Sequence, residues 1–504
     1  MLKIRIMSLF AALAIANVIP AFSQDYSKSI FEGHSDVGAC DIAGNLTFNH
    51  DNQEYTLSGS GENIWFGTDQ FHYAWKKIKG DFILRANVEF VGEGSHMHRK
   101  IGWMVRESLE TNSPHVSGTV HGDGLTSLQY RKTEGSETLE RKSETVAPDV
   151  IQLERKGNRY IFSCARSGEP FDTVAISEML TSGDVFAGIF ICSHDNNVLE
   201  QARFFNVRII RPAKEDFVPY RDYIGSNLEV MDAETGLRKV VFQSPVSIQA
   251  PNWTPDGNYL IYNSEGLLFK FDLSTSKPEK INTGFATSNN NDHVLSFDGR
   301  MLGISNHVSA EDNRSIIFTM PADGGTPKRI TSEGPSYLHG WSPDGRFLTY
   351  TADRNGHFDI FKISLKKKKE IRLTDAPGLD DGPEYSPDGK YIYFNSSRTG
   401  TMQLWRMSPD GIDQEQLTFD EYNNWFPHIS PDGKWIVFLS FPKEVRAEDH
   451  PFYKHVYIRI MPAEGGTAVV KAYVYGGQGT INVPSWSPDS KKIAFVSNSN
   501  LSDF

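Results

Sequence analysis

Trp341-Ser342-Pro343-Asp344-Gly345 is one copy of a five-residue turn motif that decides the fold of the C-terminal half. Proline fixes φ, aspartate hydrogen-bonds nearby backbone and glycine accepts a positive φ, so each copy is expected to form a tight turn. Six copies occur, at residues 253–257, 295–299, 341–345, 385–389, 429–433 and 486–490. Their aspartates are 42, 46, 44, 44 and 57 residues apart. A period of about 40–45 residues is that of a four-stranded propeller blade.

The segments after each copy support this interpretation. An apolar strand follows the turn, as at residues 347–351, 391–394 and 435–439. A second polar turn leads to a third strand, as at 359–363 and 403–407. Hairpin follows hairpin with no room for a crossover helix, which is the antiparallel meander of one blade. Six copies therefore predict a six-bladed β-propeller over residues 226–504.

The two ends of this region indicate how the ring closes. After copy six, only one strand, at residues 492–496, precedes the end of the sequence. Strand-like segments at 227–231 and 239–242 come before copy one. We expect these two segments to complete the sixth blade, because closure removes a sheet edge that would otherwise be exposed.

The repeat resembles that of TolB-like, WD-repeat-like β-propellers. The resemblance lies in Trp-Ser-Pro-Asp-Gly, the apolar strand, Asp353-Arg354-Asn355-Gly356 and then Asp359-Ile360-Phe361. Copy two departs from it, with Leu295 in place of tryptophan and Phe297 in place of proline. Copy six ends in Ser490 instead of glycine. We expect both blades to form, with altered turns.

Residues 24–212 lack the repeat and show short strand patterns instead. These lie at residues 54–57, 82–90, 100–106, 126–131, 151–155, 159–162, 186–190 and 204–207. Their alternation predicts an antiparallel β-sandwich, followed by a linker at 213–225, so the whole chain is expected to be all-β. The segments 102–106 and 153–158 resemble concanavalin/laminin-G-like jelly rolls. That resemblance implies a carbohydrate-binding shape.

Residues 1–23 have the features of a signal peptide: a positively charged start, an apolar run at 7–21 and the small residues of Ala21-Phe22-Ser23. We expect a periplasmic or secreted protein that does not span a membrane. A net charge of −12 argues against a nucleic-acid partner, which would need a basic face. Three cysteines, Cys40, Cys164 and Cys192, leave open a disulfide or buried free thiols.

Polar residues just before the turn motifs are the first set of candidate site residues, because the strand leading into each turn lines a propeller's channel. They are Asn252, Asp292, His293, His339, Asp381, Glu384, Asn424, His428, Asn482 and Ser485. Histidines and carboxylates in one ring can hold a divalent metal or bind sugar hydroxyls. They can equally be the polar walls of a solvated channel. Their uneven offsets from the motif weaken the metal interpretation.

Polar residues of the sandwich are the second set. Arg106, His121, Gln129 and Arg131 are the leading candidates, with His96, His98 and Asp123 nearby in sequence. Sugar sites combine such groups with an aromatic ring, here Trp65, Tyr73 or Trp103. The alternatives are an ordinary polar outer face and, for Trp103, a place in the core.

Two functions remain open. The preferred one is an exported binding or scaffold protein without a cofactor, whose sandwich recognises a glycan or envelope polymer and whose propeller docks a protein or saccharide partner. The alternative is a saccharide lyase or hydrolase that uses the channel histidines and carboxylates, with or without a divalent metal. The sequence has no Gly-x-Ser-x-Gly nucleophile elbow, so no catalytic residue is assigned.

Overall fold

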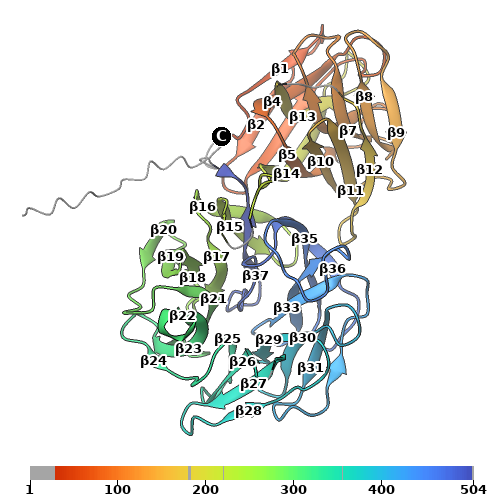
Figure 1. Cartoon of the computed structure of the whole chain (residues 1–504). Helices are drawn as coiled ribbons and strands as arrows, with labels where there is room; N and C mark the ends of the chain where they lie inside the picture. Colours follow the sequence, from red (N-terminus) through yellow and green to blue (C-terminus); the bar gives the residue numbers. More distant parts are fainter. Residues whose placement is uncertain (1–28, 180–182, 219–220, 355, 502–504) are drawn as a thin grey trace, which may run out of the picture.

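The computed structural model describes residues 29–179, 183–218, 221–354 and 356–501. They form a β-sandwich followed by a β-propeller, which confirms the predicted all-β class (Figure 1). The predicted signal peptide and its cleavage site lie outside the described residues.

Two seven-stranded sheets make up the sandwich in the described residues. The first, in spatial order, is β1 (Gly33–Val37), β4 (Phe71–Lys79), β13 (Asp184–Cys192), β6 (Lys100–Arg106), β7 (His115–His121), β8 (Thr126–Arg131) and β9 (Leu139–Lys142). The second is β12 (Asp172–Ile176), β11 (Arg159–Ala165), β10 (Val150–Lys156), β5 (Phe82–Val91), β14 (Glu200–Ile210), β3 (Glu54–Gly59) and β2 (Asn45–Asn49).

The sandwich core lies between these sheets. Trp103 of β6, Leu84 of β5 and Phe162 of β11 are fully buried in one apolar cluster. Burying a large apolar side chain contributes about 1.5–3 kcal/mol, so this cluster holds the sheets together. Each sandwich strand expected from sequence lies within an observed strand, whereas β1, β2, β4, β7, β9 and β12 were not anticipated. The sequence of β7, His115-Val116-Ser117-Gly118, carries a weak apolar signal.

Six sheets form the propeller in the described part of the C-terminal half. Blades one to three contain β17 (Gln249–Trp253), β18 (Tyr259–Ser264), β19 (Leu267–Asp272) and β20 (Lys277–Lys280); β21 (Asn289–Leu295), β22 (Met301–Val308), β23 (Arg314–Pro321) and β24 (Lys328–Arg329); and β25 (Ser336–Trp341), β26 (Phe347–Asp353), β27 (Phe358–Ser364) and β28 (Glu370–Arg372). The 3-10 helix η1 (Ser309–Glu311) connects β22 to β23.

Blades four to six follow the same plan, with one difference in the last. They contain β29 (Asp380–Tyr385), β30 (Ile392–Ser396), β31 (Gln403–Met407) and β32 (Glu415–Gln416); β33 (Asn423–Ile429), β34 (Trp435–Phe441), β35 (Lys454–Pro462) and β36 (Val469–Gly476); and β37 (Lys492–Asn498), β15 (Ser226–Asp232) and β16 (Arg238–Ser244). Blade six therefore joins strands from both ends of the propeller. β15 pairs antiparallel with β37, from Ser226↔Asn498 to Asp232↔Lys492, which confirms the predicted closure.

One hydrogen bond recurs in all six turn motifs. The Ser342 hydroxyl donates to Asp344 Oδ1 at 2.6 Å, and Oδ1 also accepts from the Arg346 amide at 3.0 Å. The equivalent hydroxyl–carboxylate distance in the other copies is 2.5–2.7 Å. Copy two keeps this bond, from Ser296 to Asp298, despite Phe297. The expectation of an altered turn there is wrong, because the serine and aspartate set the turn without the proline.

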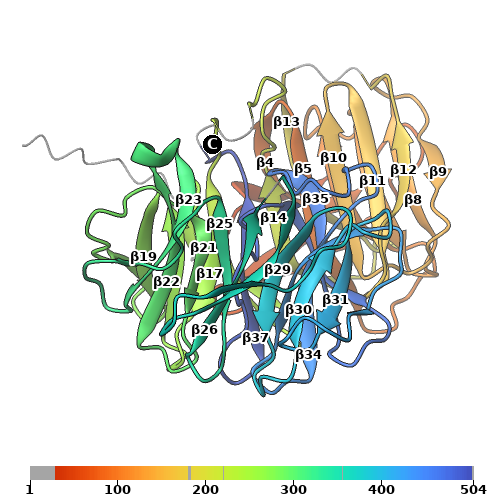
Figure 2. The ribbon, with the colours of Figure 1, turned by 60° about the horizontal axis from the view of Figure 1, so that its bottom comes forward.

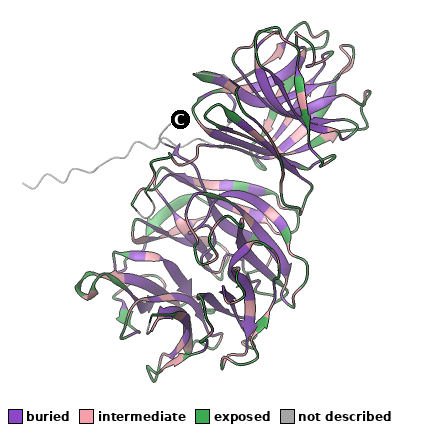
Figure 3. Cartoon of the chain, turned by 45° about the vertical axis from the view of Figure 1, so that its right-hand side comes forward, coloured by how far each residue is buried: buried purple, intermediate pink, exposed green. Residues whose placement is uncertain are grey.

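The sandwich packs beside the ring and against its outer strands. Gln53 hydrogen-bonds the Val240 backbone of β16 through both its amide atoms, at 2.9 and 3.0 Å. The Val470 amide of β36 donates to the Gly168 carbonyl at 3.0 Å. The buried Arg208 of β14 pairs with Glu229 of β15 at 2.6 Å. Figure 1 shows the sandwich next to the blades and clear of the ring centre, Figure 2 shows it beside the blades from another side, and Figure 3 shows exposed residues mainly in loops.

Candidate functional site

A cavity of about 1210 Å³ lies in the propeller channel. Four of the expected channel residues line it: Asn482 and, on three strands, Asp292 of β21, His339 of β25 and Asp381 of β29. These are the innermost strands of three successive blades, which is why residues about 45 positions apart in sequence meet. We call this space the channel cavity.

His339 and Asp381 form an ion pair in the wall of this cavity. His339 Nε2 lies 3.2 Å from Asp381 Oδ1, which also accepts from the Thr351 hydroxyl at 2.6 Å and the Gly382 amide at 2.7 Å. Although burial opposes it, hydrogen bonding to Asp381 and the charges of Asp292 and Asp381 raise the pKa of His339. Burial alone would raise the pKa of Asp381, but the contact with His339 lowers it to about 2. The contact therefore favours the charged form of both side chains.

Asp292 behaves differently from Asp381. Burial raises its pKa to about 7, with the charge of Asp381 adding to the effect and that of His339 opposing it. The cavity thus holds one carboxyl group that is ionised at neutral pH and one that is close to half-protonated. Two carboxyl groups with separated pKa values are the usual requirement for acid–base chemistry, and they also suit a ligand that offers both hydrogen-bond donors and acceptors.

His450 completes this group, and sequence reasoning missed it. It lies in the connection between β34 and β35 and lines the channel cavity with Glu448 and Phe452. Its ring packs 4.3 Å from that of Trp425, and burial lowers its pKa. The long spacing of 57 residues between the last two turn motifs was the available signal, because it reports an insertion in blade five.

Other expected channel residues join blades to one another. Asn252 Oδ1 accepts from the Leu295 amide of the next blade at 3.0 Å. Glu384 does the same for the Ile429 amide at 3.1 Å, and its second oxygen lies 2.6 Å from His428 Nδ1. The position directly before the turn motif is therefore used between blades, and the cavity residues lie further back along the strand.

The remaining members of the set have local partners. His293 Nε2 lies 3.2 Å from the Ile261 carbonyl, and burial lowers the His293 pKa to about 4. Asn424 accepts from the Ser440 hydroxyl at 2.7 Å. Asn482 lines the cavity, and the Ser485 hydroxyl donates to the Val483 carbonyl at 2.8 Å.

The chemistry of the channel cavity is amide-rich, aromatic and acidic. Asn263, Asn289, Asn290 and Asn291 contribute amides, and Tyr223, Tyr337, Phe358, Phe426 and Phe452 contribute rings. Glu265 and Glu448 add carboxylates, and the described lining includes neither lysine nor arginine. An acidic ligand would meet like charges there, whereas a neutral or cationic one would not.

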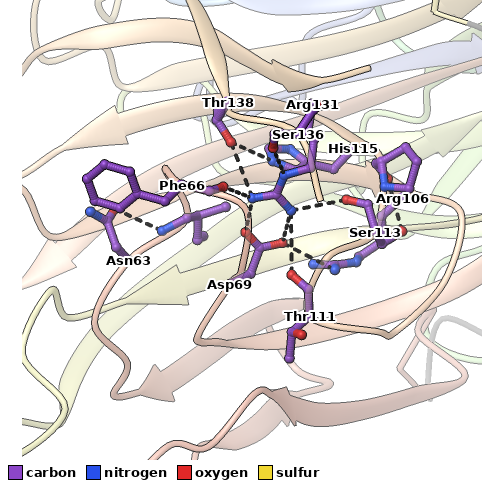
Figure 4. A network of polar contacts seen from close by, with 12 residues as sticks. Asn63, Phe66, Asp69, Arg106, Thr111, Ser113, His115, Arg131, Ser136 and Thr138 are labelled. Carbon is purple, nitrogen blue, oxygen red and sulfur yellow. Dashed lines mark hydrogen bonds and ion pairs between the residues drawn. The ribbon is translucent and has the colours of Figure 1, made fainter. Parts of the chain in front are cut away.

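In the sandwich, Arg106 and Arg131 point at each other across a shared carboxylate. Both are fully buried, and Arg131 binds the two oxygens of Asp69 at 2.7 and 2.9 Å while Arg106 approaches at 3.3 Å (Figure 4). Arg131 also donates to the Ser136 and Ser113 carbonyls. These guanidinium groups are directed at protein acceptors, so they hold the loop containing Asp69 onto the sheet.

The other sandwich candidates divide between core and rim. Gln129 is buried, and its Nε2 donates to Glu140 at 3.1 Å and lies 3.0 Å from His121 Nε2. Trp103 is in the core, and the buried Tyr73 hydroxyl donates to the Met104 carbonyl at 2.9 Å. Trp65 is half-buried at the rim.

Cys40, Cys164 and Cys192 are free thiols in the structure. Within the described residues, no helix is long and apolar enough to cross a bilayer.

Comparison with known proteins identifies relatives of the C-terminal half. The model of the TolB beta propeller domain matches residues 339–449. An uncharacterized protein of Agrobacterium fabrum is 47% identical over 272 residues, which are 54% of this chain and 92% of that protein. The structure of a putative TolB from Agrobacterium tumefaciens is 46% identical with a TM-score of 0.53, over 55% of this chain and 99% of that one. TolB from Acinetobacter baumannii is 20% identical with a TM-score of 0.40, over 50% of this chain and 64% of that one.

Proposed function

We propose, from the premise that this chain belongs through its C-terminal half to the TolB-like β-propeller family, that it is an exported binding scaffold. The channel cavity would receive a neutral or positively charged segment of a partner protein. Export is inferred from the signal-peptide features of residues 1–23.

The composition of the channel cavity is the observation that carries this proposal. Side-chain amides pair with the backbone of an extended segment, and aromatic rings pack on its side chains. Asp381 stays ionised because its pKa is lowered to about 2, so it offers a fixed negative charge to a lysine, an arginine or an amino terminus. The sandwich lies beside the ring and not over its centre (Figure 1).

The sandwich is the proposed second recognition module, for a glycan or envelope polymer. Phe66 is 63% exposed in the loop before β4, next to the half-buried Trp65. Aromatic rings at the edge of a polar face are the usual stacking surface for sugars.

Arrays of short peptides and of glycans, probed with the full-length protein, test both parts. We expect neutral and basic peptides to bind and acidic ones to fail, and we expect Asp381→Asn to weaken peptide binding by at least about 10-fold, equivalent to 1.4 kcal/mol. Phe66→Ala should affect only glycan binding. Glu279→Gln, an exposed carboxylate on β20, is the matched control. Preferential binding of acidic peptides, or peptide binding indifferent to Asp381→Asn, would refute the channel proposal.

A second candidate function is a saccharide lyase or hydrolase. The separation of the Asp292 and Asp381 pKa values, about 7 and about 2, favours it, because a protonated and an ionised carboxyl group can act as acid and base. Incubation with neutral oligosaccharides for a hydrolase and with uronate-containing oligosaccharides for a lyase, read by new reducing ends, tests it. Turnover that Asp292→Asn abolishes would establish the enzyme and replace the scaffold proposal.

A further inference from the structure

The sandwich carries a group of potential metal ligands away from the channel cavity. His121 ends β7, Asp123 lies in the turn between β7 and β8, and His98 lies in the loop before β6. One donor atom from each residue lies within 4.8 Å of the other two. His194, just after β13, brings its ring centroid to 5.6 Å from that of His98. We propose that His98, His121 and Asp123 bind a divalent transition-metal ion such as zinc.

Backbone hydrogen bonds hold the two ligand-bearing loops together. The Asp123 amide donates to the Met97 carbonyl at 2.9 Å, and the Gly122 amide donates to the Arg99 carbonyl at 2.9 Å. The buried Arg99 pairs with Glu200 of β14 at 2.6 Å, which anchors the loop containing His98 to the other sheet. The three ligands therefore face one another by construction of the fold, as a preorganised site requires.

One of these residues, His121, has a buried nitrogen without a hydrogen-bond partner in the part of the chain that the structure describes. His121 is 5% exposed, and its Nδ1 has no hydrogen-bond partner among the described residues. An unpaired buried polar atom costs about 1–3 kcal/mol, and buried groups of this kind call for an explanation. The Nδ1 of His194 is also buried without a hydrogen-bond partner among the described residues. A bound cation would take up the lone pair of His121 Nδ1.

Gln129 is the neighbour that would orient the His121 ring. Its Nε2 lies 3.0 Å from His121 Nε2, and its Oε1 is buried without a partner. Metal binding through Nδ1 requires the His121 proton on Nε2, so the Gln129 amide would have to reverse, losing the bond from its Nε2 to Glu140, and present Oε1 to the ring. Ligating histidines commonly donate their second N–H to such an acceptor.

The donor set selects the class of metal. Imidazole nitrogen suits zinc, cobalt, nickel and iron, whereas calcium and magnesium prefer oxygen ligands alone. Two histidines and one carboxylate leave a coordination position for water or for a donor group of a ligand. Ligands about 2.1 Å from a tetrahedral ion lie about 3.4 Å from each other, and the three donors here lie within 4.8 Å of one another. His98 is half-buried and Asp123 is exposed, so both side chains have room to move.

Metal titration of the untagged full-length protein tests the proposal. After treatment with a chelator, the protein is titrated with Zn²⁺ by calorimetry and with Co²⁺ by visible absorption. We expect one equivalent per chain, with cobalt d–d bands that report nitrogen ligation. His98→Gln and Asp123→Asn should each weaken binding by at least about 10-fold, the size of loss that even a supporting residue causes.

The variants are chosen so that folding does not confuse the result. Asp123 Oδ1 accepts from the Leu125 amide at 3.0 Å, a bond that asparagine keeps, so Asp123→Asn preserves the turn. His50→Gln is the matched control, because His50 pairs with Asp51 at 2.8 Å on the surface. The absence of Zn²⁺ and Co²⁺ binding would overturn the proposal. So would binding that survives both ligand variants or that His339→Ala abolishes, since the ion would then lie elsewhere.

Discussion

Two buried aspartates show how the two halves of this molecule use the same side chain. Asp69 in the sandwich is fully buried between Arg106 and Arg131. Asp381 in the propeller is also buried, but its partner is His339 and both line the channel cavity. The first centre closes a loop onto a sheet, whereas the second faces a space of about 1210 Å³.

The difference follows from how each half holds its fold. The sandwich joins strands that are distant in sequence, so it depends on non-local polar contacts such as that of Asp69. The propeller repeats one local turn six times, and residues directly before the turns join neighbouring blades. The His339–Asp381 pair also joins two blades, but its side chains line the channel cavity and can contact a ligand as well. Substitutions in the two halves should therefore differ in their effect on stability.

Removing Asp69 should give the largest effect. Asp69→Ala leaves two buried guanidinium groups without a counter-charge, and breaking a buried ion pair in this way costs about 3–5 kcal/mol. Asp381→Ala should cost less than half as much, because His339 can release its proton while arginine cannot. Urea unfolding of both variants at pH 7 measures the two free energies. Equal losses would show that the channel pair is as structural as the sandwich centre.

Replacing Asp292 should give an intermediate effect that depends on pH. Folding raises the Asp292 pKa from 3.8 to about 7, mainly through burial. Its contribution to stability is therefore fully present below pH 3.8 and is lost as the pH rises through about 7, since the buried group must then ionise. Asp292→Asn should consequently become more stabilising by about 2–3 kcal/mol between pH 5 and pH 8, given 1.4 kcal/mol per unit of pKa.

Unfolding titrations at both pH values check this prediction. Glu279→Gln, which removes one carboxylate from the exposed edge strand β20, controls for the change in net charge. A gain for Asp292→Asn that is the same at pH 5 and pH 8 would mean that Asp292 is ionised in the folded protein throughout, and that the cavity is more polar than its burial indicates.

The same division explains what could be predicted from sequence. The period of the turn motif can be read directly from the sequence. The number of blades and the pairing of β15 with β37 could therefore be predicted from it. No local sequence pattern indicates that Asp69 contacts residues 37 and 62 positions further along the chain. Arg106 and Arg131 were therefore predicted to be ligand-binding groups. In the channel, Asp292, His339 and Asp381 could be predicted from the sequence because they precede turn motifs. His450 could not be predicted in this way, because it lies in an insertion.

Ser490 tests whether the local turns stabilise the propeller, and its replacement should have the smallest effect on the free energy of unfolding. Its φ is 62°, a left-handed value, where glycine stands in the other five copies with φ of 68–74°. A side chain in that conformation costs about 1 kcal/mol, so Ser490→Gly should stabilise the protein by about 0.5–1 kcal/mol. Gly345→Ser is the reciprocal variant, since a Cβ at Gly345 meets no atom within 4 Å and only backbone conformation is at stake.

The Ser490 hydroxyl also accepts from the Asp432 amide of the neighbouring turn at 3.0 Å, a bond that glycine cannot make. Urea unfolding of both variants therefore weighs the turn against the contact between blades. Stabilisation by Ser490→Gly together with a loss of about 1 kcal/mol for Gly345→Ser would place the cost in the turn itself. Destabilisation by Ser490→Gly would instead mean that blade five holds blade six through this bond, and that ring closure depends on a non-local contact just as the sandwich does.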